Sequence, residues 1–127
     1  MIFDTDILIW FHWGDDEAER AIKTTPLERR FISIITYLEL VQGVRNKAEL
    51  KSLQETITGA GFNILPANEV VSWLAKNYME NYKLKSGIGI YDALIAATAS
   101  HYGRTLFTGN FKHFKDLGIS VRQFVKN

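Results

Sequence analysis

The stretch Tyr91 to Ser100, YDALIAATAS, constrains the fold more than any other part of the chain. Six of its residues are alanine, leucine or isoleucine, which predicts a helix with almost no polar face. Such a helix has to be buried on most sides, and its alanines favour the helical state. Its one carboxylate, Asp92, stands at the beginning of the helix, where backbone N–H groups and the macrodipole favour negative charge. Asp92 could simply cap the helix or belong to a buried acidic site, and this stretch alone leaves both open.

Short apolar runs alternate with helical segments along the chain. This alternation predicts one α/β domain spanning residues 1–127, in three α/β/α layers, with a central, mainly parallel sheet and right-handed connections. The expected strands are Met1–Phe3, Phe31–Ile35, Phe62–Leu65, Thr105–Phe107 and Ile119–Val125. The other expected segments are helices at Ile7–Phe11, Glu17–Thr25, Lys47–Thr58 and from Asn68 onward, and a mobile loop at Tyr82–Gly89.

Glu39 has two interpretations. Thr36 is an expected N-cap, and Glu39 stands three residues further on, which is the spacing of a capping box. Against this, Leu38, Leu40 and Val41 flank Glu39, so it is an acid in apolar surroundings. Acids in such surroundings are candidates for functional carboxylates, and the sequence leaves both interpretations open.

The composition excludes some kinds of site and leaves the partner open. The chain has no cysteine, which excludes a disulfide framework and a thiolate metal site and is typical of a cytoplasmic protein. Its net charge of +1 neither requires nor excludes a nucleic-acid partner. The N-terminal segment MIFDTDIL has no basic leader, and no apolar run reaches the ~18 residues of a membrane span. We therefore expect a cytoplasmic protein that does not cross a membrane.

Polar residues follow two of the expected strands and begin the buried helix. Asp4 comes directly after the first strand, Asn110 follows the fourth, and Asp92 begins the helix. The carboxyl ends of neighbouring parallel strands share one crevice, so these side chains and Glu39 could meet there. Two carboxylates ~4 Å apart repel by about 4 kcal/mol at an effective dielectric constant of ~20, so three together require protons or a cation. No lysine or arginine adjoins Asp4, Glu39 or Asp92 in the sequence, which favours Mg²⁺ or Mn²⁺, ions that prefer oxygen ligands.

Four segments of the chain together resemble the PIN-domain ribonuclease family, and most closely its VapC-type toxins from type II toxin–antitoxin systems. They are MIFDTDILI, ITYLELVQG, YDALIAATA and LFTGNFKHF, the last followed by GISV. The resemblance implies a metal-dependent endoribonuclease whose Mg²⁺ or Mn²⁺ is held by Asp4, Glu39 and Asp92. The family's fourth acidic position falls in TGNFKHF, at Asn110. This asparagine departs from the acidic pattern but can still offer a carbonyl oxygen to a metal or hold a water.

The resemblance also implies supporting residues and partners. Thr5, Asp6 and Thr108 would support the acidic site, and Thr108 matches a hydroxyl position beside it. The toxin's partner would be an antitoxin protein that covers the site, and the toxin would often form a homodimer. Independently of the resemblance, five residues near the expected crevice are candidates for contacts with the RNA backbone: Lys83, Lys85, Arg104, Lys112 and His113. His113 could instead lie in a solvated turn.

Two other functions fit the same residues. The run Asp4-Thr5-Asp6 after a strand also resembles haloacid-dehalogenase phosphatases, in which Asp4 would be the nucleophile, although the later lysine and acidic pair of that family have no convincing counterpart. The chain could also be a catalytically inactive binding module whose acids only cap helices. A nuclease would use a metal-bound water to attack the phosphodiester bond.

Three clustered aromatic residues either pack in the core or form a partner surface: Trp10, Phe11 and Trp13.

Overall fold

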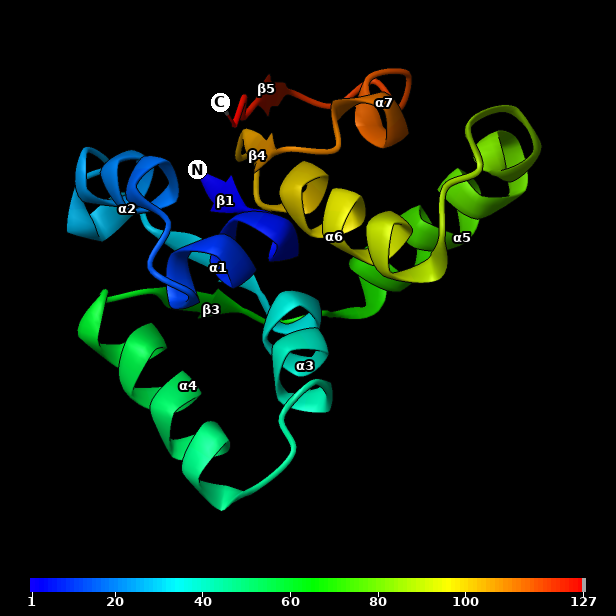
Figure 1. The fold of residues 1–127 in the computed structure, drawn as a ribbon. Helices are drawn as coiled ribbons and strands as arrows, with labels where there is room; N and C mark the ends of the chain where they lie inside the picture. The colour runs from blue at the N-terminus through cyan, green and yellow to red at the C-terminus, as the bar shows by residue number, and fades with distance from the viewer. Residues whose placement is uncertain (127) are drawn as a thin grey trace.

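A single parallel sheet forms the centre of the molecule (Figure 1). The computed structural model describes residues 1–126, and within them five strands lie in the order β3-β2-β1-β4-β5. Every pairing between neighbouring strands of this sheet is parallel, so β1 is central and its carboxyl end lies between those of β2 and β4. The strands are β1 (Ile2–Phe3), β2 (Phe31–Ser33), β3 (Asn63–Leu65), β4 (Leu106–Thr108) and β5 (Val121–Gln123).

Helices cover both faces of this sheet. In Figure 1, α5 and α6 lie on one side of the strands and α1 and α2 on the other. This arrangement confirms the predicted three-layer α/β/α fold. Within residues 1–126, no helix is long and apolar enough to cross a membrane. The helices are α1 (Thr5–His12), α2 (Asp16–Lys23), the 3₁₀ turn η1 (Leu27–Arg29), α3 (Ile34–Gln42), α4 (Lys47–Gly59), α5 (Glu69–Ser86), α6 (Ile90–His101) and α7 (Phe111–Phe114).

Neighbouring residues in the two central strands point to opposite faces of the sheet and enter different cores. Ile2 and Leu106 are fully buried in a core that they form with α5 and α6. Phe3 and Phe107 enter a second core with α1, α2 and α4, where their ring centroids lie 5.8 Å apart. Each large apolar side chain buried in this way contributes about 1.5–3 kcal/mol. Burial on both faces therefore holds strands of only two or three residues in place.

The buried helix predicted at Tyr91–Ser100 is α6. Ala93, Ala96 and Ala97 are fully buried, with 0% of each residue accessible to solvent. Because these side chains are small, α5 packs closely beside α6, as Figure 1 shows. The position of α6 is thus fixed from several sides, which also fixes the residues of its first turn.

The start of α6 differs from the prediction. Its N-cap is Gly89, and the helix begins at Ile90, one residue before the expected start. The interpretation of Asp92 as a helix cap is therefore wrong, because Asp92 is the third residue of the helix and lies in its first turn. The C-terminal end of α6 agrees with the expected helix, since Gly103 follows it with a φ of +62°, a conformation that glycine adopts readily.

Strand β2 ends at Ser33, two residues earlier than expected. Ser33 is the N-cap of α3, because its Oγ accepts a hydrogen bond from the Thr36 backbone N–H at 3.0 Å. The predicted capping box, with Thr36 as the cap and Glu39 three residues on, is therefore wrong. Glu39 is the sixth residue of α3 and lies beyond its first turn, so capping does not account for its acidic side chain.

The predicted loop at Tyr82–Gly89 is helical as far as Ser86. Gly87 then ends α5 in a left-handed conformation with φ of +71°. Lysine is a good helix former, and Lys83 and Lys85 lie in the last turn, where positive charge interacts favourably with the helix dipole. The basic composition of this segment therefore extends the helix rather than ending it.

The position of the α3 cap gives a test of stability. We expect Ser33→Ala to lower the free energy of unfolding by about 1–2 kcal/mol, because the buried Thr36 N–H loses its acceptor. Urea unfolding followed by circular dichroism measures this. Asn46→Ala removes the equivalent cap of α4 at an exposed site, where water can replace the side chain, and should cost less. Equal stability of Ser33→Ala and the unmodified protein would contradict this role of Ser33.

Candidate active site

Four acidic side chains come together at the carboxyl edge of the sheet, and we call them the acidic cluster. Asp4 directly follows β1, Asp6 lies in the first turn of α1, Glu39 lies on α3 and Asp92 lies in the first turn of α6. Burial is the main cause of a raised pKa at Asp4, Asp6 and Glu39, and repulsion by Asp92 raises each pKa further. The structure thus brings together Asp4, Glu39 and Asp92, with Asp6 as a fourth acid.

Asp4 is the most buried member of the acidic cluster, with 5% of the residue exposed. Burial raises the pKa of Asp4 to about 7, and the neighbouring Asp6 carboxylate adds to the effect. Two donors oppose it: the Thr5 backbone N–H donates to Oδ1 at 2.8 Å, and the Thr108 hydroxyl donates to Oδ2 at 2.7 Å. Thr108 comes from the end of β4, so this contact joins the carboxyl ends of the two central strands.

Glu39 is held by hydroxyl groups. The Thr5 hydroxyl donates to Glu39 Oε1 at 2.8 Å. The same oxygen of Thr5 lies 3.1 Å from the hydroxyl of Thr36, which in turn contacts the hydroxyl of Ser33. Burial raises the pKa of Glu39, the bond from Thr5 lowers it, and Asp92 raises it. Thr5, which directly follows Asp4, therefore holds Glu39 near Asp92 in the first turn of α6.

Asp6 fixes the turn after β4. Its Oδ2 accepts a hydrogen bond from the Gly109 backbone N–H at 3.0 Å. A Cβ atom at Gly109 would lie 2.7 Å from the same oxygen and 3.0 Å from the indole ring of Trp10, so any other residue here would have to displace Asp6. Trp10 thus closes one side of the site by packing under the turn, and Asp6 holds that turn against α1.

Asp92 contacts α7 through His113. The His113 Nδ1 lies 2.9 Å from Asp92 Oδ2 and 2.8 Å from the side-chain nitrogen of Asn110. One ring nitrogen cannot donate to Asp92 and accept from Asn110 at once, so only one contact is a hydrogen bond in a given protonation state. The structure thus places Asn110 and His113 beside Asp92. The alternative of a solvated turn is wrong for His113, because its ring is partly buried against that carboxylate.

The basic residues predicted to contact RNA do not all lie at the end of the sheet that carries the acidic cluster. Lys112 is exposed on α7, next to His113, and Lys83 and Lys85 are exposed in the last turn of α5. Arg104 precedes β4, at the amino end of that strand, and its guanidinium packs 4.2 Å from the ring centroid of Phe31. The expectation that Arg104 adjoins the crevice is therefore wrong, because the acidic cluster lies at the opposite end of the strands.

Apart from His113 beside Asp92, the part of the chain that the structure describes offers the acidic cluster no basic partner. Within residues 1–126, no lysine or arginine forms an ion pair with any of its four carboxylates. The same part of the chain contains no group of three acidic or histidine side chains close enough to enclose an ion. Acidic oxygens without a positive partner fit a hydrated cation such as Mg²⁺, which is commonly held by one or two carboxylates and several waters.

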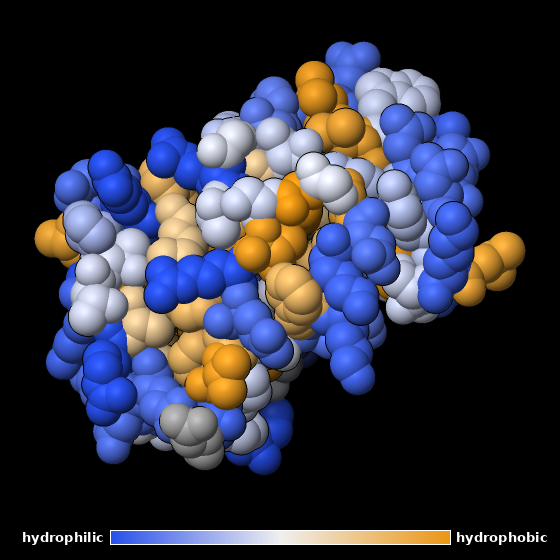
Figure 2. All heavy atoms as spheres, turned by 90° about the horizontal axis from the view of Figure 1, so that it is seen from above, coloured by the Kyte–Doolittle hydropathy of each residue, from blue (hydrophilic) through white to orange (hydrophobic). Residues whose placement is uncertain are grey.

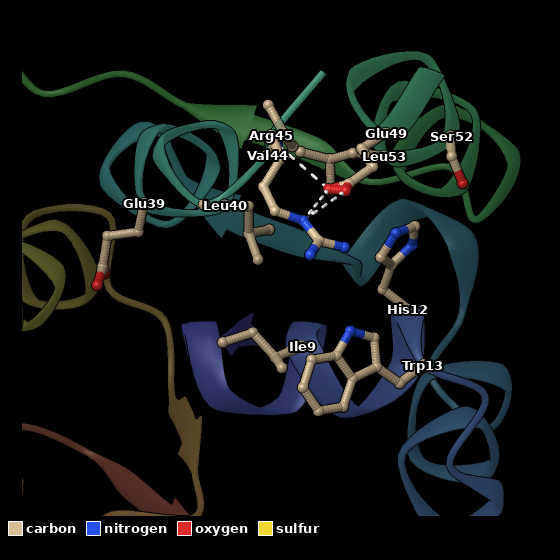
Figure 3. Close-up of a pocket in the computed structure, with 11 residues that line it drawn as sticks. Ile9, His12, Trp13, Glu39, Leu40, Val44, Arg45, Glu49, Ser52 and Leu53 are labelled. Carbon is tan, nitrogen blue, oxygen red and sulfur yellow. Dashed lines mark hydrogen bonds and ion pairs between the residues drawn. The ribbon is translucent and has the colours of Figure 1, made fainter. Parts of the chain in front are cut away.

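A cavity of about 590 Å³ borders the acidic cluster between α1 and α4 (Figure 3). Ile9 and Trp13 line it from α1, and Arg45 and Glu49 line it from the opposite side, where Arg45 Nε lies 3.1 Å from both Glu49 oxygens. Figure 3 shows Glu39 at one end of the cavity, pointing away from the Arg45–Glu49 pair. A ligand in this cavity would therefore lie next to the acidic cluster.

The three clustered aromatic residues separate into core and surface. Trp10 and Phe11 are partly buried and pack against the core on the α1 face of the sheet. Trp13 is 81% exposed and stands at the cavity of Figure 3. The core interpretation is therefore confirmed for Trp10 and Phe11, whereas a partner surface at Trp13 stays a prediction.

The chain thus has a three-layer α/β/α fold, and within residues 1–126 the four acids at the carboxyl edge of its sheet form no ion pair with lysine or arginine. The sequence profile described as PIN domain matches residues 1–119, and the chain belongs to this family. The predicted family is therefore confirmed. The match also favours a nuclease over the phosphatase in which Asp4 would be the nucleophile.

Its relatives include VapC ribonucleases. The chain is 34% identical over 119 residues to ribonuclease VapC10 of Mycobacterium tuberculosis, a match that covers 90% of this chain and 85% of the relative. It is 34% identical over 129 residues to ribonuclease VapC1 of Rickettsia felis, covering 95% of this chain and 93% of the relative. Its structure is similar to a toxin–antitoxin complex from Klebsiella pneumoniae, with a TM-score of 0.78 and 29% identity over 96% of this chain and 95% of that one. These matches confirm the resemblance to VapC-type toxins.

The family resemblance named Thr5 and Thr108 as supporting residues, whereas sequence reasoning missed Ser33 and did not say which contacts hold the acids. Ser33 ends β2, Thr5 follows β1 and Thr108 ends β4, so a hydroxyl group stands near the carboxyl end of each of three adjacent strands. That repeated position was a visible signal, because hydroxyl groups can donate to carboxylates. The contact between Gly109 and Asp6 carried no comparable signal, since it depends on how the turn after β4 approaches α1.

Asp4 gives a pH-dependent prediction. Its pKa is about 7 in the folded protein and 3.8 without the fold, so the folded state holds a proton that the unfolded state releases between these values. The metal-free protein should therefore lose stability as pH rises from about 4 to about 7, by a few kcal/mol in order of magnitude. Asp6 and Asp92 are the charges that oppose ionisation of Asp4. Urea unfolding in EDTA at several pH values measures this.

The control for this prediction is a matched pair of variants. Asp4→Asn should remove most of the pH dependence and make the metal-free protein more stable than the unmodified chain at pH 8, because it removes a buried charge. Asp116→Asn changes an exposed acid by the same charge and should leave the pH dependence in place. Identical pH profiles for Asp4→Asn and the unmodified protein would contradict a raised pKa at Asp4.

Proposed function

We propose that this chain is an endoribonuclease, the toxin of a VapBC-type toxin–antitoxin pair, which hydrolyses RNA phosphodiester bonds with Mg²⁺ or Mn²⁺ in the cytoplasm. The observation that carries the proposal is the acidic cluster, whose carboxylates meet without a lysine or arginine partner within residues 1–126. Asp4, Glu39 and Asp92 are the proposed metal ligands, and Asn110 is the fourth residue of the site. The names of the relatives, VapC ribonucleases, support this assignment.

Hydrogen bonds hold the carboxylates that would bind the proposed cation. A bound divalent cation would supply an activated water and would stabilise the negative charge that develops on the phosphate. Thr108 and the Thr5 N–H hold both oxygens of Asp4 in place, and the Thr5 hydroxyl holds Glu39. His113 orients Asp92 when its Nδ1 donates to that carboxylate. These contacts preorganise the carboxylates, so little rearrangement is needed when substrate binds.

The two alternative functions have less support. A module whose acids only cap helices does not need four carboxylates in one place, and neither Glu39 nor Asp92 is a cap. A phosphatase would need Asp4 as an accessible nucleophile, whereas Asp4 is almost fully buried and both its oxygens accept hydrogen bonds. Trapping of a phosphorylated aspartate at position 4 would instead support the phosphatase function.

Loss of one carboxylate tests the nuclease. We expect Asp92→Asn to reduce RNA cleavage by at least ~10²-fold, because replacement of a metal ligand should cost more than loss of one of its supporting contacts. Cleavage of labelled RNA in Mn²⁺ or Mg²⁺ measures this, and circular dichroism verifies the fold. Asp116→Asn is the matched control and should remain active. Full activity of Asp92→Asn, or activity of the unmodified protein in excess EDTA, would refute the proposed mechanism.

The cavity of Figure 3 is the proposed docking site for the antitoxin. It combines an exposed indole, Trp13, with apolar side chains such as Ile9 and Leu53, and it ends at Glu39. A segment of antitoxin in this cavity would cover the approach to the acidic cluster. The structural similarity to a toxin–antitoxin complex supports such a partner.

A homodimer is also part of the proposal, since Leu84, Ile90 and Tyr91 leave apolar surface exposed at the adjoining ends of α5 and α6.

Tryptophan fluorescence tests the docking site. We expect binding of the cognate antitoxin to shift the emission of the protein to shorter wavelength, because Trp13 would move from water into an interface. Trp13→Phe should remove most of the shift. Trp73→Phe is the matched control, because Trp73 is 59% exposed on α5, and it should leave the shift unchanged. An unchanged spectrum despite binding measured by calorimetry would exclude Trp13 from the interface.

A further inference from the structure

Three arginines surround a second cavity, of about 570 Å³, at the other end of the strands. Arg29 comes from η1, Arg104 lies two residues before β4, and Arg122 lies on β5. We call these three residues the arginine patch. Since Thr105 and Met1 also line the cavity and precede β4 and β1, the patch lies toward the amino ends of the strands, away from the acidic cluster.

Among the described residues, the guanidinium groups of the patch have no acidic partners. Within residues 1–126, none of the three arginines forms an ion pair. The residues that line the cavity include no aspartate or glutamate. Burial lowers the pKa of the Met1 amine, and the positive charges of Arg104 and Arg29 lower it further, which shows that both charges act at one place. The cavity is therefore a region of uncompensated positive charge.

Aromatic rings hold two of these guanidinium groups in position. The guanidinium carbon of Arg104 lies 4.2 Å from the centroid of Phe31, and that of Arg122 lies 5.2 Å from the centroid of Phe107. Phe107 and Arg122 are paired in the sheet, which explains why they stack. Figure 2 shows hydrophilic side chains lying across apolar ones on the face seen from above. Stacked guanidinium groups keep their N–H donors directed outward, in a geometry suited to phosphate oxygens.

We propose that the arginine patch is a second RNA-binding surface, which contacts backbone phosphates of substrate RNA at a distance from the acidic cluster. This inference rests on the proposed ribonuclease function and adds to it a preference for longer RNA. Three cations on three separate elements fit a chain of phosphates better than one small anion. Backbone contacts of this kind increase affinity without selecting a base sequence.

The distance between the two sites sets the length of RNA required. Strand β4 has three residues, so at roughly 3.3 Å per residue Thr105 and Gly109 lie about 13 Å apart. That is about four steps of the ~3.4 Å rise per nucleotide in one strand of a duplex, before the RNA turns around the edge of the sheet. A dinucleotide is therefore too short to reach both sites, whereas a longer or folded RNA can contact both.

Binding experiments on an inactive background test this surface. In the Asp92→Asn protein, Arg104→Gln/Arg122→Gln should weaken binding of an RNA of about forty nucleotides by roughly tenfold. The effect on a dinucleotide should be much smaller, because a dinucleotide cannot contact both arginines and the acidic edge at once. The slope of log affinity against log salt should fall by about 1.4, which is ~0.7 for each of two lost phosphate contacts. Fluorescence anisotropy measures both. Because binding is measured without cleavage, failure of the proposed nuclease activity would not alter this result.

Charge-matched variants separate a local role from a general loss of positive charge. Lys47→Gln/Lys51→Gln removes the same charge from α4 and should leave both RNAs bound as before. Arg104→Lys/Arg122→Lys keeps the charge and should restore most of the affinity, which also controls for loss of the fold. Unchanged binding of the long RNA, or equal loss for both RNAs, would overturn the proposal. ATP binding that depends on the arginine patch, with long RNA unaffected, would likewise overturn it in favour of a small-anion site.

Discussion

Repulsion between buried carboxylates is the constraint on which the rest of the structure depends. Asp6 and Asp92 raise the pKa of the buried Asp4, and Asp92 raises the pKa values of Asp6 and Glu39. No lysine or arginine within residues 1–126 forms an ion pair with any of these four carboxylates. Such a cluster destabilises the metal-free fold, so the cores on both faces of the sheet have to outweigh it. The alternating burial of Ile2 and Phe3 and of Leu106 and Phe107 provides that stability directly beneath the site.

Hydroxyl groups near the ends of the strands hold these mutually repelling carboxylates in defined positions. Thr108 and Thr5 donate to Asp4 and Glu39 respectively, and each joins two elements that are distant in the sequence. A neutral donor orients a carboxylate without cancelling its charge, whereas a lysine or arginine in the same place would occupy it as an ion pair. The acids therefore remain available to a cation, as the proposed function requires.

Much of the fold followed from the sequence because it depends on local patterns. The apolar runs and the alanine-rich stretch at Tyr91–Ser100 gave the order of elements, and Asp4 could be placed because it directly follows a strand. Element ends were less predictable: Ser33 and Thr36 are both good caps, and only packing decides between them. For the site, the meeting of Glu39 with Asp92 and the contact of His113 with Asp92 depend on how α3, α6 and α7 pack, which no local pattern encodes.

Arg104 shows how sequence distance misleads when strands are short. It lies six residues before Asn110, yet β4 separates the two, so one stands at the amino end of the sheet and the other at the carboxyl end. The same short strand separates two edges of opposite charge. Within residues 1–126, no lysine or arginine forms an ion pair with the acids at one edge, and no acid forms one with the arginine patch at the other. A polyanion is repelled by the acidic edge until a cation is bound there, whereas the arginine edge attracts it at all times. Attraction at a distance from the reacting centre can thus retain RNA while the acidic edge remains free to take up its metal.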